Sequence, residues 1–181
     1  LLERNSVGES FKKWPKETRF ISPSFTGNFF KMPDLNAITP DTSPAFDLLT
    51  EHPTGEEYAV YLEQVSTFFN LLITTDIEVK SIEDKGDGFF LNTNKGVYAS
   101  SFIIWAAGEY QYPKTNSFEG DHHCIHYSEI DSFSDILGAN SVVIGAYESG
   151  FDAAINLAKL GKKVTLVDDS NYLELVKSDS S

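Results

Sequence analysis

The sequence is poor in cysteine, in basic residues and in long apolar runs, and each shortage weighs against a class of function. It has one cysteine, Cys124, so an internal disulfide and a C-x-x-C redox pair are both excluded within the chain. So little cysteine is typical of the reducing cytoplasm, which is the compartment we expect. The 14 basic residues stand against 27 acidic ones, and a net charge of −13 disfavours nucleic-acid binding because like charges repel. No apolar run approaches the roughly 20 residues that a membrane span needs, so no membrane partner is expected.

The first ten residues, LLERNSVGES, lack the features of a natural start. They contain neither a basic region nor an apolar stretch, which disfavours a signal peptide. They also lack a methionine, which predicts that the chain begins inside a longer protein.

The composition nevertheless predicts a folded protein, since 41% of the residues are hydrophobic and 13% are aromatic. Residues 1–55 mix prolines with aromatic residues, which predicts an ordered, irregular wrap with no long helix. Thr54 and Glu57 form the capping-box pattern that predicts a helix start. The turn sequences KGDG and TNKG help to predict strands at 71–75, 77–83, 88–94, 96–99 and 101–106. A short strand is expected near residues 122–126.

Residues 142–170, VVIGAYESGFDAAINLAKLGKKVTLVDDS, are typical of a strand, a glycine turn, a helix and a second strand. In the dinucleotide fingerprint G-x-G-x-x-G, Gly145 and Gly150 take the first and third places, while Tyr147 takes the second. The helix start would offer free amides to a pyrophosphate, and an acid about 20 residues further on usually binds the ribose. The expected dinucleotide-binding residues are Gly145, Tyr147, Glu148, Ser149, Gly150 and Asp168.

Two alternatives accompany this interpretation. The turn can be structural only, in a fold that binds no nucleotide. If it binds one, Asp168 and Asp169 at the strand end disfavour a 2′-phosphate, so NADH is favoured over NADPH within the general prediction of NAD(P)H.

The segment HHCIH, residues 122–126, invites a zinc hypothesis because histidine and cysteine are zinc ligands. In a strand, His122, Cys124 and His126 would share one face. No fourth ligand accompanies them, so we expect no metal site, and Cys124 is expected to be a buried, inert thiol.

The segment FIIWAAGEYQYPKTNSFEG, residues 102–120, carries a family resemblance. It resembles the small-small-Gly segment of flavoproteins with two dinucleotide-binding domains. Ala106, Ala107 and Gly108 match that segment, with alanine in the place of the usual threonine. FEGDHHCIHYSEI and the pattern G-x-x-E-S-G-F-D-A-A at 145–154 are similar to flavin-containing monooxygenase-like proteins. Flavoprotein disulfide reductases for low-molecular-weight thiols are close relatives by pattern.

The resemblance implies an α/β, Rossmann-like fold that binds FAD and NAD(P), here as a partial chain with a β-meander. Residues 1–140 would form part of the FAD-binding domain, and residues 141–181 the first β-α-β unit of the NAD(P)H-binding domain. The chain would then be a middle fragment of the whole protein. No catalytic residue is assigned.

The implied activity is that of an FAD-dependent oxidoreductase similar to monooxygenases, in which NAD(P)H reduces the bound flavin and the substrate is a small molecule. Val79 would lie beside the adenine of FAD through its backbone. The flavin ring would be lined by Trp14, Ser24, Phe25, Thr26 and Asn28, although these residues can equally form core. A disulfide reductase, a non-catalytic dinucleotide-binding module and a piece that binds neither cofactor remain alternatives, and a homodimer is left open.

Overall fold

The computed structural model describes residues 1–25, 34–115 and 117–169. The chain forms two compact units. Unit 1 comprises Leu1–Lys12 and Phe20–Tyr112, and unit 2 comprises Lys13–Arg19 and Pro113–Ser181. The assignment of residues 1–140 to an FAD-binding domain is a functional division at a different residue, and it stays a prediction.

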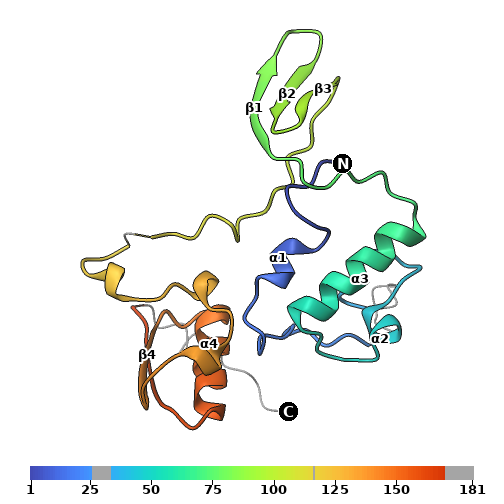
Figure 1. The fold of residues 1–181 in the computed structure, drawn as a ribbon. Coiled ribbons are helices and arrows are strands. Elements are labelled where there is room, and N and C mark those ends of the chain that lie inside the picture. The colour runs from blue at the N-terminus through green and yellow to red at the C-terminus, as the bar shows by residue number, and fades with distance from the viewer. Residues whose placement is uncertain (26–33, 116, 170–181) are drawn as a thin grey trace. The chain divides into compact units, whose positions relative to one another are not determined.

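The helices of unit 1 are dominated by α3, Gly55–Phe68, which begins where the sequence predicts (Figure 1). The amide of Glu57 donates to the Thr54 side chain, and the Thr54 amide donates to the Glu57 carboxylate at 2.7 Å. Each partner therefore satisfies a donor that the helix start would otherwise leave open. Among the described residues of unit 1, α1 (Glu9–Lys12) and α2 (Pro44–Asp47) are single turns in the proline-rich part of the chain.

The core of unit 1 is aromatic. Tyr61 is fully buried and Tyr58 nearly so, and the rings of Phe11 and Phe20 lie 4.8 Å and 4.4 Å from that of Tyr58. The buried hydroxyl of Tyr58 donates to the carbonyl of Asn36 at 2.8 Å. A buried tyrosine hydroxyl needs such a partner, so this bond ties the irregular, proline-containing wrap to α3.

The β-meander of unit 1 consists of β1 (Val79–Asp84), β2 (Phe89–Thr93) and β3 (Gly96–Ser100), in antiparallel order β1-β2-β3 (Figure 1). These strands confirm the ones predicted at 77–83, 88–94 and 96–99, with the two predicted turns between them.

Two other predicted strands of unit 1 are wrong. Around residues 71–75 there is only an isolated bridge, between Thr74 and Leu2, because the short N-terminal segment offers a single paired residue. Residues 101–106 form no ladder, and Phe102 and Ile104 are 85% and 91% exposed. A fully apolar strand is stable between neighbouring strands, and the described residues place none beside this segment.

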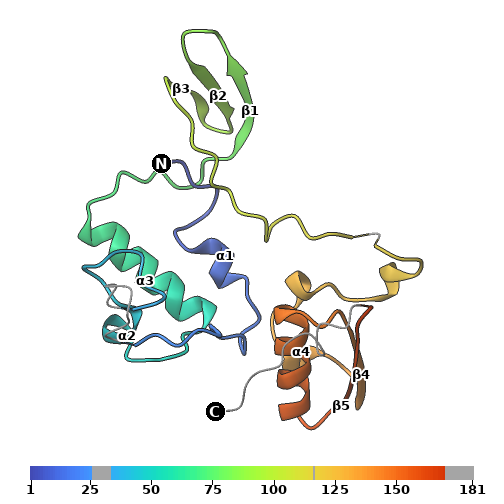
Figure 2. The same cartoon turned by 180° about the vertical axis from the view of Figure 1, so that it is seen from behind.

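Unit 2 contains the predicted β-α-β unit. The strands β4 (Asn140–Ile144) and β5 (Lys163–Val167) are parallel, and α4 (Glu148–Lys159) lies along one face of them (Figure 2). Ala153 and Leu157 on α4 are buried together with Phe133, and Val143 and Val164 of the two strands pack against that cluster.

Three short 3-10 helices precede β4, namely η1 (Asp121–His123), η2 (Tyr127–Glu129) and η3 (Phe133–Asp135). The strand predicted near residues 122–126 is therefore wrong. Gly120 has a left-handed φ of +90°, and its carbonyl accepts from the His123 amide at 3.0 Å, which curls the chain into a turn. In the part of the chain that the structure describes, no helix is both long and apolar enough to cross a membrane.

Candidate functional site

The glycine turn between β4 and α4 has the geometry that the fingerprint requires. Gly145 has a φ of +99°, a left-handed conformation that a side chain would strain, and its amide continues the sheet by donating to the Val167 carbonyl at 2.8 Å. A β-carbon at Gly150 would overlap the carbonyl oxygen of Gly145 and would lie 2.8 Å from its carbonyl carbon. Both glycines are therefore needed, the first for the turn and the second for the close approach of helix and strand.

The first turn of α4 has backbone amides that make no bond within the helix. The first helical backbone bond runs from the Phe151 amide to the Tyr147 carbonyl at 3.0 Å. The amides of Glu148, Ser149 and Gly150 precede that bond and therefore stand at the open end of the helix, where the positive end of its dipole lies. This arrangement suits the pyrophosphate of a dinucleotide.

Tyr147 occupies the place of the second fingerprint glycine without backbone strain. Its φ of −98° is accessible to any residue, and its side chain is 71% exposed. Glu148 lies in the first turn of α4 and brings a negative charge, so it would not neutralise a phosphate. The backbone amides and the exposed Ser149 are the groups with the right chemistry for that task.

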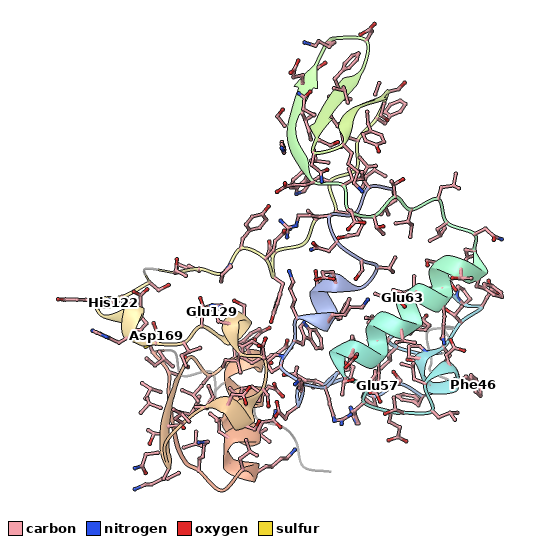
Figure 3. The ribbon with its side chains drawn as sticks, viewed as in Figure 1. Phe46, Glu57, Glu63, His122, Glu129 and Asp169 are labelled. Carbon is pink, nitrogen blue, oxygen red and sulfur yellow. The ribbon has the colours of Figure 1, made fainter. Side chains whose placement is uncertain are left out.

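Asp168 follows β5 directly and contacts the glycine turn. Its carboxylate accepts from the amide of Ala146 at 3.4 Å. Ala146 is 4% exposed and was not among the predicted site residues, since a small side chain at a variable position of the fingerprint gives no signal in the sequence. The next residue, Asp169, is exposed and follows β5 in Figure 3. The structure thus brings the predicted acid to the same end of the sheet as the turn.

The predicted flavin-lining residues fall in different units. Trp14 belongs to unit 2, whereas Ser24 and Phe25 belong to unit 1. Ser24 is fully buried and its hydroxyl accepts from the Asn36 side chain at 2.8 Å, while Phe25 is 40% exposed. Thr26 and Asn28 lie outside the described residues.

Val79 is the first residue of β1, which is an edge strand of the meander. One row of the backbone groups of an edge strand faces away from its neighbour, and a base can be recognised by such groups. Val79 is half-buried and stands beside a register shift between Val79 and Ser81. Its predicted role beside adenine stays a prediction.

The small-small-Gly segment has no regular secondary structure and is followed directly by a turn, in which the Tyr112 amide donates to the Glu109 carbonyl at 2.8 Å. Ala106, Ala107 and Gly108 are exposed, and Gly108 has a left-handed φ of +69°. The Gln111 side chain donates to the Ala107 carbonyl at 2.8 Å. The left-handed φ favours glycine at position 108, although the strand expected before it is not formed.

The histidine-rich segment does not have the geometry of a three-ligand face. His122 and His123 lie on η1, with their rings 4.0 Å apart, and Figure 3 shows His122 projecting away from it. Cys124 is exposed, so the expectation of a buried thiol is wrong. Within residues 1–25, 34–115 and 117–169, no group of three or more His, Cys, Asp or Glu side chains is placed to hold a metal ion.

A family profile matches the whole chain. Residues 1–181 match the family described as pyridine nucleotide-disulphide oxidoreductase. Among curated proteins, the uncharacterized oxidoreductase CzcO of Bacillus velezensis is 29% identical over 123 residues, which are 66% of this chain and 35% of that protein.

Solved structures show the same fold. The bacillithiol disulfide reductase Bdr (YpdA) of Staphylococcus aureus matches with a TM-score of 0.73 and 25% identity, over 92% of this chain and 48% of that one. A flavin-containing monooxygenase of Stenotrophomonas maltophilia matches with a TM-score of 0.68 and 15% identity, over 89% of this chain and 47% of that one. The predicted flavoprotein fold is confirmed, and the chain spans about half the length of these structures and about a third of the curated relative.

Proposed function

Because the chain belongs to the pyridine nucleotide-disulphide oxidoreductase family, we propose that the protein is an FAD-dependent oxidoreductase in which NAD(P)H reduces the bound flavin, as in monooxygenases. The observation that carries the proposal is the turn at Gly145 and Gly150, where only glycine fits and the amides of α4 are open. The flavin supplies the redox chemistry, and the protein binds, orients and shields the reacting groups.

The dinucleotide would be held by the first turn of α4. The amides of Glu148, Ser149 and Gly150, with the hydroxyl of Ser149, donate to the pyrophosphate, and Asp168 accepts from the ribose hydroxyls. Asp168 is already near the turn through its contact with the Ala146 amide. Tyr147 lies at the mouth of this turn, where its exposed ring can cover the nucleotide.

FAD would be held mainly by unit 1. We assign the adenine to the backbone of Val79, and the segment Ala106, Ala107 and Gly108 to the passage between the FAD and NAD(P)H parts. Trp14, Ser24, Phe25, Thr26 and Asn28 are the proposed residues around the flavin ring. Ser24 fits a positioning role better than direct contact, because its buried hydroxyl already bonds to Asn36.

A reductase for a small-molecule disulfide is the second candidate. It is favoured by the likeness to the bacillithiol disulfide reductase of Staphylococcus aureus, which at a TM-score of 0.73 exceeds that to the flavin-containing monooxygenase at 0.68. The substrate would again be a small molecule. A dithiol relay within residues 1–181 is ruled out by the single cysteine, so electrons would pass from flavin to the disulfide without a cysteine pair of this segment.

The acidic strand end favours NADH as the reductant. Asp168 and the exposed Asp169 would repel a 2′-phosphate, and they suit the two free hydroxyls of an NADH ribose. A cytoplasmic location is proposed from the scarcity of cysteine. A homodimer is an open possibility for the quaternary structure.

The proposal is tested by isolating the complete protein and identifying its bound cofactor after denaturation. We expect FAD to be released, and we expect consumption of NADH to depend on an acceptor. Oxygen as the acceptor supports the monooxygenase-like reaction, and a low-molecular-weight disulfide supports the second candidate. A protein that takes up no FAD and oxidises neither NADH nor NADPH would leave only a dinucleotide-binding module or a non-binding piece.

A further inference from the structure

A short N-terminal segment belongs to the unit that carries the dinucleotide turn. Lys13–Arg19 clusters with unit 2, although the residues on both sides of it belong to unit 1. We call Lys13–Arg19 the strap. Its backbone is fixed to unit 2 by the Lys16 amide, which donates to the Asp131 carbonyl at 2.9 Å.

The strap contacts α4 through Thr18. This residue is 7% exposed, and its hydroxyl donates to a carboxylate oxygen of Asp152 at 2.6 Å. The Tyr127 hydroxyl donates to the same oxygen at 2.7 Å, and the Thr18 and Tyr127 hydroxyls are 2.6 Å apart. The side chain of Asn156 donates to the other carboxylate oxygen at 2.9 Å. Both oxygens of Asp152 are therefore fixed, one by the strap and one by the helix itself.

Glu17 of the strap also contacts residues on which α4 packs. The Glu17 carboxylate accepts from the Ser132 hydroxyl at 2.6 Å and from the Phe133 amide at 3.0 Å. Burial alone would raise the pKa of Glu17, but these hydrogen bonds outweigh it and lower the pKa. Phe133 is fully buried in the cluster that includes Ala153 of α4, so Glu17 fixes a residue on which the helix packs.

These contacts lie next to the dinucleotide turn. Asp152 follows Gly150 by two residues, so fixing its carboxylate limits the rotation of α4 about its axis near the open amides. Hydrogen bonds to a carboxylate are among the stronger ones available to hold a helix.

We infer that the strap is a positioning element for dinucleotide binding, with Thr18 and Glu17 as its positioning residues. The inference rests on the proposed function and goes beyond it, since neither residue belongs to the fingerprint. A strap of purely structural value would change the stability of unit 2 and leave the affinity of the folded protein for dinucleotide unchanged.

The experiment compares Thr18→Val, which keeps the shape and removes the hydroxyl, with Thr18→Ser, which keeps the hydroxyl. Thr67→Val is the matched control, because the Thr67 hydroxyl bonds to Glu63 within α3 of unit 1. The Kd for NADH and for NADPH is measured in the complete protein. The temperature is kept well below the lowest thermal unfolding midpoint among the variants. We expect Thr18→Val to raise the Kd of the preferred nucleotide about tenfold, the effect of one lost bond to a carboxylate. Thr18→Ser and Thr67→Val should stay within about twofold of the unmodified protein.

Glu17→Gln provides a second test if Thr18→Val does not fold. It keeps one acceptor oxygen and loses the other, so we expect a smaller increase in Kd, of about threefold. An unchanged Kd in the folded variants, with only a lowered unfolding midpoint, overturns the inference and leaves the proposed function intact. If the unmodified protein binds neither NADH nor NADPH, the proposed function fails and the inference fails with it.

Discussion

Replacing Gly150 with alanine is the sharpest perturbation that the glycine turn allows. The added β-carbon would overlap the carbonyl oxygen of Gly145 and lie 2.8 Å from its carbonyl carbon. Both are backbone atoms, so no change of rotamer can relieve the contact. Either α4 moves away from β4 or the turn at Gly145 opens, and each change displaces the amides at the helix start.

The size of the expected effect follows from the contact at Gly150 and from the amides that it displaces. Overpacking of a close contact typically costs about 1–3 kcal/mol of stability. Loss of two amide bonds to a charged phosphate, at about 1.5–3 kcal/mol each, would raise the Kd for dinucleotide by at least about 100-fold. The loss of binding free energy should therefore exceed the loss of folding stability.

The assay is a titration of the Gly150→Ala protein with NADH, beside a thermal unfolding scan. Gly161→Ala is the control, because Gly161 ends the same helix with a φ of +81° and has open space where the β-carbon would be. It should lose about 1–2 kcal/mol through the strained backbone and keep its affinity for NADH. A Gly150→Ala protein that binds NADH as tightly as Gly161→Ala does would show that the close approach at Gly150 does not place the binding amides.

Three further predictions concern separate parts of the chain. Asp168→Asn removes the charge that disfavours a 2′-phosphate, so the ratio of kcat/KM for NADPH to that for NADH should rise about tenfold, and an unchanged ratio would show that Asp168 does not read the ribose. Thr54→Ala removes the cap of α3 and should lower the free energy of unfolding by about 1 kcal/mol in denaturant titrations; equal midpoints and slopes would contradict the capping role. Burial, with the nearby charges of Tyr61 and Asp34, raises the pKa of Tyr58 to about 12 from 10.0. The folded state then holds the proton longer, so the free energy of unfolding should fall more steeply between about pH 10 and 12 than in Tyr58→Phe, and parallel pH profiles would contradict this.

Local patterns were sufficient wherever the stabilising contacts are local. The capping box at Thr54 and Glu57 predicts the start of α3, and it is confirmed by the two reciprocal bonds. The spacing of Gly145 and Gly150 likewise predicts a turn whose requirement for glycine is visible in its backbone angle and close contact. In both places the deciding interactions join residues three to five positions apart.

Prediction failed where a neighbour had to be supplied from elsewhere. The apolar run at 101–106 has the composition of a buried strand, but a strand also needs a ladder partner, and composition does not provide one. The contact of Thr18 with Asp152 spans 134 positions, so no local pattern could reveal it. The segment at 122–126 was read by the alternation of its side chains, whereas the turn at Gly120 decided its conformation.

The central claim is that NAD(P)H bound at the glycine turn reduces a bound flavin. Its most direct test is to mix the flavin-loaded protein with NADH, and separately with NADPH, without oxygen, while following the flavin absorbance. We predict bleaching whose rate saturates with nucleotide and is faster with NADH. It should be retained in Gly161→Ala, and in Gly150→Ala it should need at least about 100-fold more nucleotide. A flavin that stays oxidised with both nucleotides, or one that bleaches equally in Gly150→Ala, would contradict it.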